Sequence, residues 1–272
     1  MVTHYAGQCY AWDVVNEALN EDGTFRTSVF FTTLNTGYLP LSFTFAAAAD
    51  PAAKLYYNDF NLETTTAKAD GAVKIVNLIK AAGARIDGVG FQAHLNVGQT
   101  PSRAALAATL SRFTALGVEV AYTELDIAHT KLPATDADNV KQAADYVSAV
   151  GSCLDVKGCV GITVWQFTDR YSWVPGTFPG KGEACLWDKD YKKKPAYDAV
   201  VKLLKGGASG TAATGTGTET GTGGSKTNST TGAVTSVPVR FSGGDTAGLS
   251  GSGVGRRLVG VLGPLVVAVL VL

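Results

Sequence analysis

The chain has 272 residues, with 23 basic and 23 acidic side chains, 46% hydrophobic residues and 32 glycines. This is enough material for one sizeable hydrophobic core and further segments. Because the net charge is near zero, the composition argues against nucleic acid or an anionic membrane surface as an electrostatic partner. All four cysteines and all four tryptophans lie before residue 190, so the chain divides into parts of different composition.

Residues 1–205 repeat one pattern, in which a short run of apolar, β-branched residues ends in polar residues and is followed by a segment with helical spacing. The predicted strands are Tyr10–Val15, Lys54–Tyr57, Gly88–Phe91, Glu119–Thr123 and Gly161–Trp165. The predicted helices are Thr65–Ala82, Ser102–Leu116, Asp136–Cys153 and Pro195–Leu204. Alternating strands and helices indicate a parallel sheet covered by helices.

Polar residues follow the end of every predicted strand: Asn16 and Glu17, Asn58 and Asp59, Gln92 and His94, Glu124 and Asp126, and Gln166 and Asp169. In a (β/α)₈ barrel, or TIM barrel, the functional face is built from these strand ends. An open doubly wound sheet would place a Gly-rich phosphate turn after its first strand, and no such motif follows any predicted strand. The sequence therefore predicts an α/β barrel of which five of the eight strands are present.

The beginning of the chain favours the same interpretation. Met1–Gln8 contains no apolar signal region, whereas the C-terminal segment is typical of a protein that enters the secretory pathway. We expect that a signal peptide and about three βα units precede these residues, so that the catalytic domain is truncated at its N-terminus.

Residues 206–253 form a segment of different character. Of these 48 residues, 32 are Gly, Ser or Thr, so the segment has too little apolar surface to offset the entropy of ordering it. We expect a disordered linker. The single sequon, Asn228-Ser229-Thr230, makes Asn228 a candidate glycosylation site, with an unmodified spacer as the alternative.

Residues 254–272 form a hydrophobic C-terminal tail. Leu258–Leu272 is uncharged but shorter than the roughly 17 to 25 residues of a membrane span. Small residues at 242–247, a polar spacer and this tail match the signal for a glycolipid (GPI) anchor, with Gly244 or Asp245 as the attachment site. We expect a secreted protein held at the cell surface; a retained membrane segment is the alternative.

Two strand ends carry carboxyl groups that suit one kind of chemistry. Glu17 follows Asn16 at the end of the first predicted strand, and Glu124 follows Thr123 at the end of the fourth. Glycoside hydrolysis needs two carboxyl groups facing each other, one protonated and one ionised. Either glutamate alone would more often be a surface residue, but their shared position at strand ends favours a catalytic role.

Six sequence runs carry a family resemblance: WDVVNEAL, LYYNDFN, IDGVGFQAHL, EVAYTELDI, GITVWQFTDRYSWVPG and KKPAYDAV. In order and spacing they resemble the second half of the glycoside hydrolase family 10 endo-β-1,4-xylanases, particularly the fungal ones, over about residues 6–204. The resemblance implies a retaining hydrolase of xylan on a TIM barrel, with about strands 4 to 8 present.

The resemblance also implies roles for individual residues. Glu17 corresponds to the general acid/base and Glu124 to the nucleophile, while His94 and Asp126 correspond to the pair that holds the nucleophile ionised and oriented. Asn16 would bind the 2-hydroxyl of the sugar at the cleavage point. The other expected sugar-binding residues are Tyr57, Asn61, Gln92, Trp165 and Trp173.

The sequence also gives expectations for the pairing of the cysteines and the exposure of two histidines. Cys153 and Cys159 bracket a short loop, as in fungal members of the family, and we expect a disulfide between them; Cys9 and Cys185 are not expected to pair. His129, like His4, matches no motif and is expected at the surface.

The chain departs from the family pattern at Phe60, and two alternative functions are also considered. Phe60 occupies a position where the family usually has Tyr, which removes a hydroxyl near the leaving group. We expect a monomer that acts on xylan or xylo-oligosaccharides, without a metal or cofactor. The alternatives are an inactive carbohydrate-binding or cell-wall fragment, and a hydrolase of a related β-1,4-glucan such as cellulose.

Overall fold

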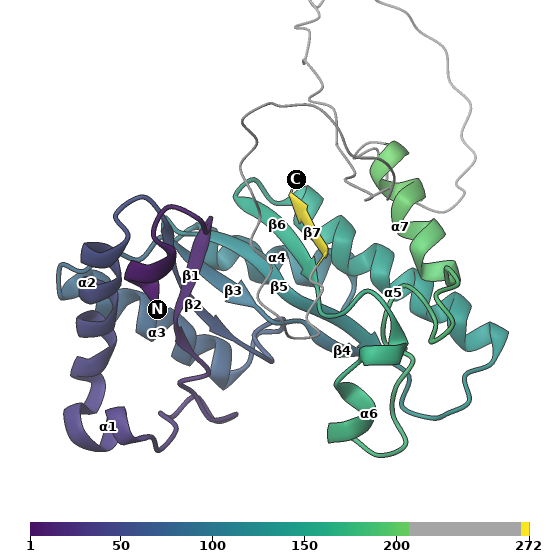
Figure 1. Ribbon diagram of the computed structural model, residues 1–272, viewed down its shortest axis with the longest axis horizontal. Coiled ribbons are helices and arrows are strands. Elements are labelled where there is room, and N and C mark those ends of the chain that lie inside the picture. Colours follow the sequence, from purple (N-terminus) through teal and green to yellow (C-terminus); the bar gives the residue numbers. More distant parts are fainter. Residues whose placement is uncertain (207–267, 272) are drawn as a thin grey trace, which may run out of the picture. The chain divides into compact units, whose positions relative to one another are not determined.

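The computed structural model describes residues 1–206 and 268–271 (Figure 1). Within them, five parallel strands alternate with helices along the chain. These strands are β1 (Ala11–Asn16), β2 (Lys54–Asp59), β3 (Gly88–Phe91), β5 (Glu119–Ala128) and β6 (Cys159–Val164). Each lies where a strand was predicted, and the largest difference is the extension of β5 to Ala128.

The strands lie side by side in the order β1-β2-β3-β5-β6, and every neighbouring pair is parallel (Figure 1). The short strand β4 (His94–Asn96) pairs with the second half of β5, and β7 (Ala268–Val271) pairs antiparallel with β6. Within the described residues β1 has a single strand neighbour, so this sheet is open. The expected parallel α/β sheet is confirmed, and its arrangement brings the carboxyl ends of the strands to one edge.

Four predicted helices are also present: α3 (Ala67–Ala81), α4 (Arg103–Thr114), α5 (Asp136–Asp155) and α7 (Pro195–Gly206). Three of them begin after a hydroxyl side chain that accepts a hydrogen bond from a backbone N–H three residues further on. These caps are Thr66, Ser102 and Thr135. Such caps satisfy donors that the first turn of a helix leaves free, which fixes where these helices begin.

Two helices between β1 and β2 were not predicted, α1 (Val29–Leu34) and α2 (Tyr38–Ala49). In α2, Phe43 is buried and Phe45 is 64% exposed, so apolar residues lie on both faces. The helix therefore lacks the alternation of polar and apolar faces on which its prediction depends. The remaining short elements are η1 (Val2–Tyr5), η2 (Asn35–Gly37), η3 (Asp169–Tyr171) and α6 (Val174–Thr177).

The hydrophobic core lies between the sheet and its helices. Its buried members include Leu55, Val89, Phe91, Val120 and Ile162 from the strands and Phe43, Ile75, Ile79, Leu110, Phe113 and Tyr146 from the helices. Alternate strand residues point away from the helices. Tyr56 is one of these, and its hydroxyl donates to Glu119 Oε1 at 2.7 Å. A Cβ atom on Gly88 would lie 2.2 Å from the Tyr56 ring, so glycine is needed there.

The predicted disulfide joins Cys153 in α5 to Cys159 at the start of β6, with their Cα atoms 5.2 Å apart. Cys9 and Cys185 are both free, as expected. This pairing ties the last long helix to the strand that follows it.

Several expectations concern residues outside the described part of the chain. These are the linker after Gly206, glycosylation of Asn228 and anchor attachment at Gly244 or Asp245. Of the predicted tail, only Ala268–Val271 is described, as strand β7. Among the described residues, no helix combines the length and the hydrophobicity that crossing a membrane requires.

Candidate active site

A cavity of about 520 Å³ lies at the carboxyl ends of the strands. Its lining includes eight of the predicted site residues: Glu17, Asn61, Gln92, His94, Glu124, Asp126, Trp165 and Trp173. These residues come from segments as far apart in the sequence as Glu17 and Trp173, and they meet because the parallel strands end at the same edge.

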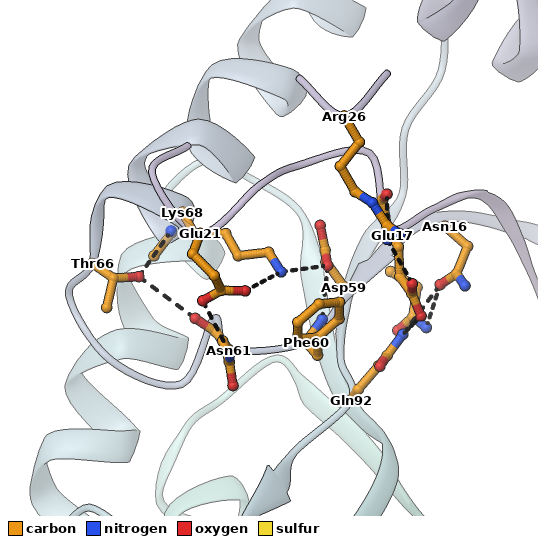
Figure 2. A network of polar contacts seen from close by, with 12 residues as sticks. Asn16, Glu17, Glu21, Arg26, Asp59, Phe60, Asn61, Thr66, Lys68 and Gln92 are labelled. Carbon is orange, nitrogen blue, oxygen red and sulfur yellow. Dashed lines mark hydrogen bonds and ion pairs between the residues drawn. The ribbon is translucent and has the colours of Figure 1, made fainter. Parts of the chain in front are cut away.

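Glu17 directly follows β1, and its carboxylate contacts two donor groups (Figure 2). Gln92 Nε2 donates to Glu17 Oε1 at 3.1 Å, and Arg26 Nη1 lies 2.8 Å from Glu17 Oε2. Burial raises the pKa of Glu17, but the hydrogen bonds and the charge of Arg26 outweigh it and hold the pKa below its ordinary value. In this state Glu17 is an ionised, paired carboxylate.

The backbone at the strand ends is strained. Glu17, Asn61, Ala93 and Gln166 follow β1, β2, β3 and β6 with φ values of 54°, 57°, 59° and 72°. Residues other than glycine adopt this left-handed region at a cost of roughly 1–3 kcal/mol, and such positions gather at functional sites. The sequence offers little signal for them, because only the asparagine is a residue type that favours this conformation.

Glu124 is held from two sides. Asn58 Nδ2 donates to Glu124 Oε1 at 3.0 Å, and His94 Nε2 lies 3.3 Å from Glu124 Oε2. On its other side, His94 Nδ1 lies 3.1 Å from Asp126 Oδ1, a close ion-pair contact whose angle is not that of a hydrogen bond. The structure therefore brings together the predicted nucleophile, histidine and aspartate.

The charge of His94 follows from these neighbours. Burial lowers the pKa of His94, but Asp126 and Glu124 together outweigh this effect and raise it to about 9. At neutral pH the ring is an imidazolium between two carboxylates, which places a positive charge directly beside Glu124.

Amide side chains connect the two glutamates. Asn16 Oδ1 accepts from Asn58 Nδ2 at 3.0 Å and from Gln92 Nε2 at 3.4 Å, and these same two amides donate to Glu124 and Glu17. The contacts fix the orientation of Asn16, which was predicted to bind sugar. Through Asn16, the two amides also connect the carboxylate of Glu124 to that of Glu17.

Asn58 was not predicted as a site residue, although it follows a predicted strand. It is 1% exposed, and Thr123 Oγ1 donates to its Oδ1 at 2.6 Å. A Cβ atom on Gly90 would lie 2.2 Å from Asn58 Oδ1, so the glycine leaves the space that Asn58 fills.

A buried lysine, Lys68, contacts the loop that follows Glu17 (Figure 2). Lys68 is fully buried, with Nζ 3.1 Å from Asp59 Oδ1, 3.0 Å from Glu21 Oε1 and 3.2 Å from the centroid of the Phe60 ring. Glu21 Oε2 also accepts from Asn61 Nδ2 at 3.0 Å. The network ties the loop that follows Glu17 to the end of β2. Sequence reasoning missed it because lysines on helices are usually exposed.

Two residue predictions are wrong. Tyr57, predicted to bind sugar, is fully buried, and its hydroxyl donates to Asp59 instead of facing the cavity. Its place in the strand alternation directs it toward the helices. His129, predicted at the surface, is 3% exposed because β5 runs further than expected and His129, which directly follows it, pairs with Gly182.

Aromatic rings form one wall of the cavity. The Trp173 ring lies 4.7 Å from the His94 ring and 5.6 Å from the Phe178 ring, and its Nε1 donates to Asp126 Oδ2 at 2.7 Å. Flat, weakly polar faces of this kind suit pyranose rings. Among the described residues, no cluster of three or more His, Cys, Asp or Glu side chains has the geometry to hold a metal ion.

Comparisons with known proteins agree with this geometry. The model of glycosyl hydrolase family 10 matches residues 1–203. The chain is 62% identical over 207 residues to endo-1,4-beta-xylanase 5 of Pyricularia oryzae, covering 76% of this chain and 51% of that protein. It is 60% identical over 208 residues to endo-1,4-beta-xylanase D of Talaromyces funiculosus, with the same coverage of 76% and 51%.

Solved structures show the same likeness. Penicillium canescens endo-1,4-beta-xylanase XylE has a TM-score of 0.73 at 43% identity, covering 76% of this chain and 64% of that chain. The family 10 xylanase of Bispora sp. MEY-1 with xylobiose has a TM-score of 0.71 at 41% identity, with coverage of 74% and 64%. The chain spans about half the length of the curated relatives it matches.

Proposed function

Because the chain belongs to glycosyl hydrolase family 10, we propose that it is an endo-1,4-β-xylanase that cleaves internal bonds of xylan with retention of anomeric configuration. The observation that carries this proposal is the position of Glu17 and Glu124, which line one cavity, Glu17 directly after β1 and Glu124 within β5. Glycoside hydrolysis uses two such carboxyl groups. The xylobiose bound by the Bispora relative supports the substrate class.

In the proposed mechanism Glu124 attacks the anomeric carbon while Glu17 donates its proton to the glycosidic oxygen, which leaves with the rest of the chain. This step forms a covalent bond between the sugar and Glu124. Glu17 then takes a proton from water, whose oxygen attacks the same carbon and releases Glu124. Asn16 is proposed to bind the 2-hydroxyl of the reacting sugar.

Positioning of the nucleophile falls to His94, Asp126 and Asn58. Asn58 and His94 each contact one oxygen of the Glu124 carboxylate, and Asp126 lies against the other nitrogen of the His94 ring, so the orientation of Glu124 is set before substrate binds. Trp165 and Trp173 are proposed to stack against sugar rings, and Asn61 and Gln92 to contact hydroxyl groups at the cavity wall.

Glu17 can act as an acid only while it carries a proton. Arg26 lowers its pKa, so this ion pair sets the upper pH limit of activity in the proposed mechanism.

The proposal extends to the location of the protein. We propose a secreted monomer whose folded domain, residues 1–205, is tethered by the linker to a glycolipid anchor near Gly244 or Asp245. The order of small residues, polar spacer and hydrophobic tail supports it. A phosphatidylinositol-specific phospholipase should release the protein from cells; a protein that stays bound and keeps the peptide 258–272 would contradict the anchor.

The test of activity uses the protein as its source makes it, assayed on xylan and on cellulose. We expect a rapid fall in xylan viscosity, and a loss of more than roughly a thousandfold in kcat for Glu124→Gln, which keeps shape but removes the nucleophile. Preference for cellulose would indicate the glucan hydrolase. Binding without hydrolysis of either polymer would indicate the inactive fragment, and both outcomes contradict the proposal.

A further inference from the structure

Lys181 lines the same cavity as the two glutamates and has no role in the proposed reaction. Its Nζ donates to Asn96 Oδ1 at 3.2 Å and lies 5.4 Å from the centroid of the Phe178 ring. Both neighbours are uncharged. Among the described residues that line the cavity, Lys181 is the only lysine or arginine, and no described carboxylate lies within 4.0 Å of its ammonium group.

Other basic side chains of this region are neutralised. Arg26 pairs with Glu17, and Lys68 with Asp59. Lys194 Nζ lies 3.2 Å from an oxygen of Asp169. Against this pattern, Lys181 presents an uncompensated positive charge to the cavity.

Strand β4 determines how far Lys181 lies from Glu124. His94 and Asn96 are two residues apart on β4, so their side chains share a face, and both line the cavity. Their separation along the strand is roughly 7 Å, on the order of one sugar unit. Since His94 contacts Glu124 and Asn96 contacts Lys181, the ammonium group is within reach of a substituent on a sugar bound next to the nucleophile.

We propose that Lys181 binds the carboxylate of a uronic acid side group on xylan, so that the protein prefers acid-substituted xylan to neutral xylan. This inference rests on the proposed function and names a finer class of substrate for it. A hydroxyl group gains little from an ammonium group, whereas a carboxylate gains a charge-assisted hydrogen bond. Because Lys181 is only partly buried, the gain is that of a partly screened ion pair.

The experiment compares a xylo-oligosaccharide bearing glucuronic acid with the same compound after its carboxyl group has been reduced to an alcohol. The quantity measured is the ratio of kcat/KM for the acidic and the neutral compound. In Lys181→Gln we expect this ratio to fall by roughly three- to tenfold. Lys181→Arg should keep it, and high salt should lower it in the unmodified protein.

Lys189→Gln is the matched control, since Lys189 is 77% exposed, lies outside the cavity and pairs with Asp190. It should leave the ratio unchanged. An unchanged ratio in Lys181→Gln would overturn the inference about Lys181. Hydrolysis of the neutral compound in the same experiment would still support the proposed function. If neither compound is hydrolysed, the proposed function fails, and calorimetric binding of the acidic compound to the unmodified protein and Lys181→Gln still decides the role of Lys181.

Discussion

At the scale of single residues, the two glutamates of the cavity differ in their partners. Glu17 meets an arginine, whereas Glu124 meets an amide and a histidine that lies against a second carboxylate. The contact with Arg26 is unexpected for a general acid, which works best with a raised pKa. For the acid/base role proposed for Glu17, the ion pair with Arg26 is therefore a contact through which its pKa can be changed.

Replacing Arg26 should move the pH profile. In Arg26→Gln the pKa of Glu17 rises because the positive charge and its hydrogen bond are lost, so Glu17 keeps its proton to higher pH. We expect the alkaline limb of the pH profile of kcat/KM, measured with a neutral xylo-oligosaccharide, to move to higher pH. Arg112→Gln, which removes an exposed pair with Asp70, should leave the profile in place. An alkaline limb that stays in place or moves to lower pH in Arg26→Gln would show that Arg26 does not hold down the pKa of Glu17.

The two glutamates should also respond differently to an external nucleophile. With an activated aryl leaving group, Glu17→Ala needs no acid for the first step, and azide replaces the base-assisted water in the second. We therefore expect azide to restore turnover in Glu17→Ala with a product of retained configuration, and Glu124→Ala to stay inactive without azide. Equal rescue of both variants to the same anomer would show that the roles are assigned wrongly.

At the scale of elements, the end of β2 connects the core to the loop that follows Glu17. Asp59 accepts from the buried Tyr57 hydroxyl and pairs with Lys68 from α3, which in turn reaches Glu21 in the loop. The ion pair between Lys68 and Asp59 is fully enclosed by protein. Removing one partner of such a pair leaves an uncompensated charge in the interior.

Lys68→Met should therefore destabilise the protein by about 3–5 kcal/mol, measured as the free energy of unfolding in urea. The double variant Lys68→Met with Asp59→Asn removes both charges and should recover part of this loss. If the double variant is as unstable as the sum of the two single variants, Lys68 and Asp59 do not interact as described. Lys74→Met, an exposed position on the same helix, is the control.

Sequence alone could predict the parts of the site that depend on local order. Glu17 directly follows β1, and Glu124 lies within β5, which runs past the predicted end at Thr123; the apolar runs of both strands are visible in the sequence, and both glutamates line the cavity. Asn58 and Lys68 were not predicted because their partners are distant in the sequence. Asn58 contacts Asn16 and Glu124, which are 42 and 66 residues away, and Lys68 contacts Glu21, which is 47 residues away. Only the fold brings these groups together.

Prediction of the fold failed where the sequence pattern is ambiguous. Helix α2 is apolar on both faces, and Tyr57 stands beside polar residues although it faces the core. In both cases the tertiary surroundings decide which face is buried, and a single sequence does not show them.

At the scale of the whole molecule, the charge of His94 couples the site to global stability. Its pKa of about 9 in the folded protein exceeds the ordinary value of 6.5. The stability it contributes is therefore fully present below about pH 6.5 and is lost as the pH rises through about 9, with a size of up to about 3 kcal/mol. The difference in free energy of unfolding between the unmodified protein and His94→Gln should shrink by this amount from about pH 6 to about pH 9.5. The exposed His4→Gln is the control, and a constant difference would contradict the proposed charge on His94.

Hydrolytic activity is the property to measure first, because the sheet of the described residues is open and the chain spans about half of each curated relative. The most direct measurement is proton NMR of the first product released from a xylo-oligosaccharide by the protein as its source makes it. Attack by Glu124 followed by attack of water inverts the anomeric carbon twice, so we expect the β-anomer first, followed by slow mutarotation. If the α-anomer appears first, water attacks directly and Glu124 is not the nucleophile.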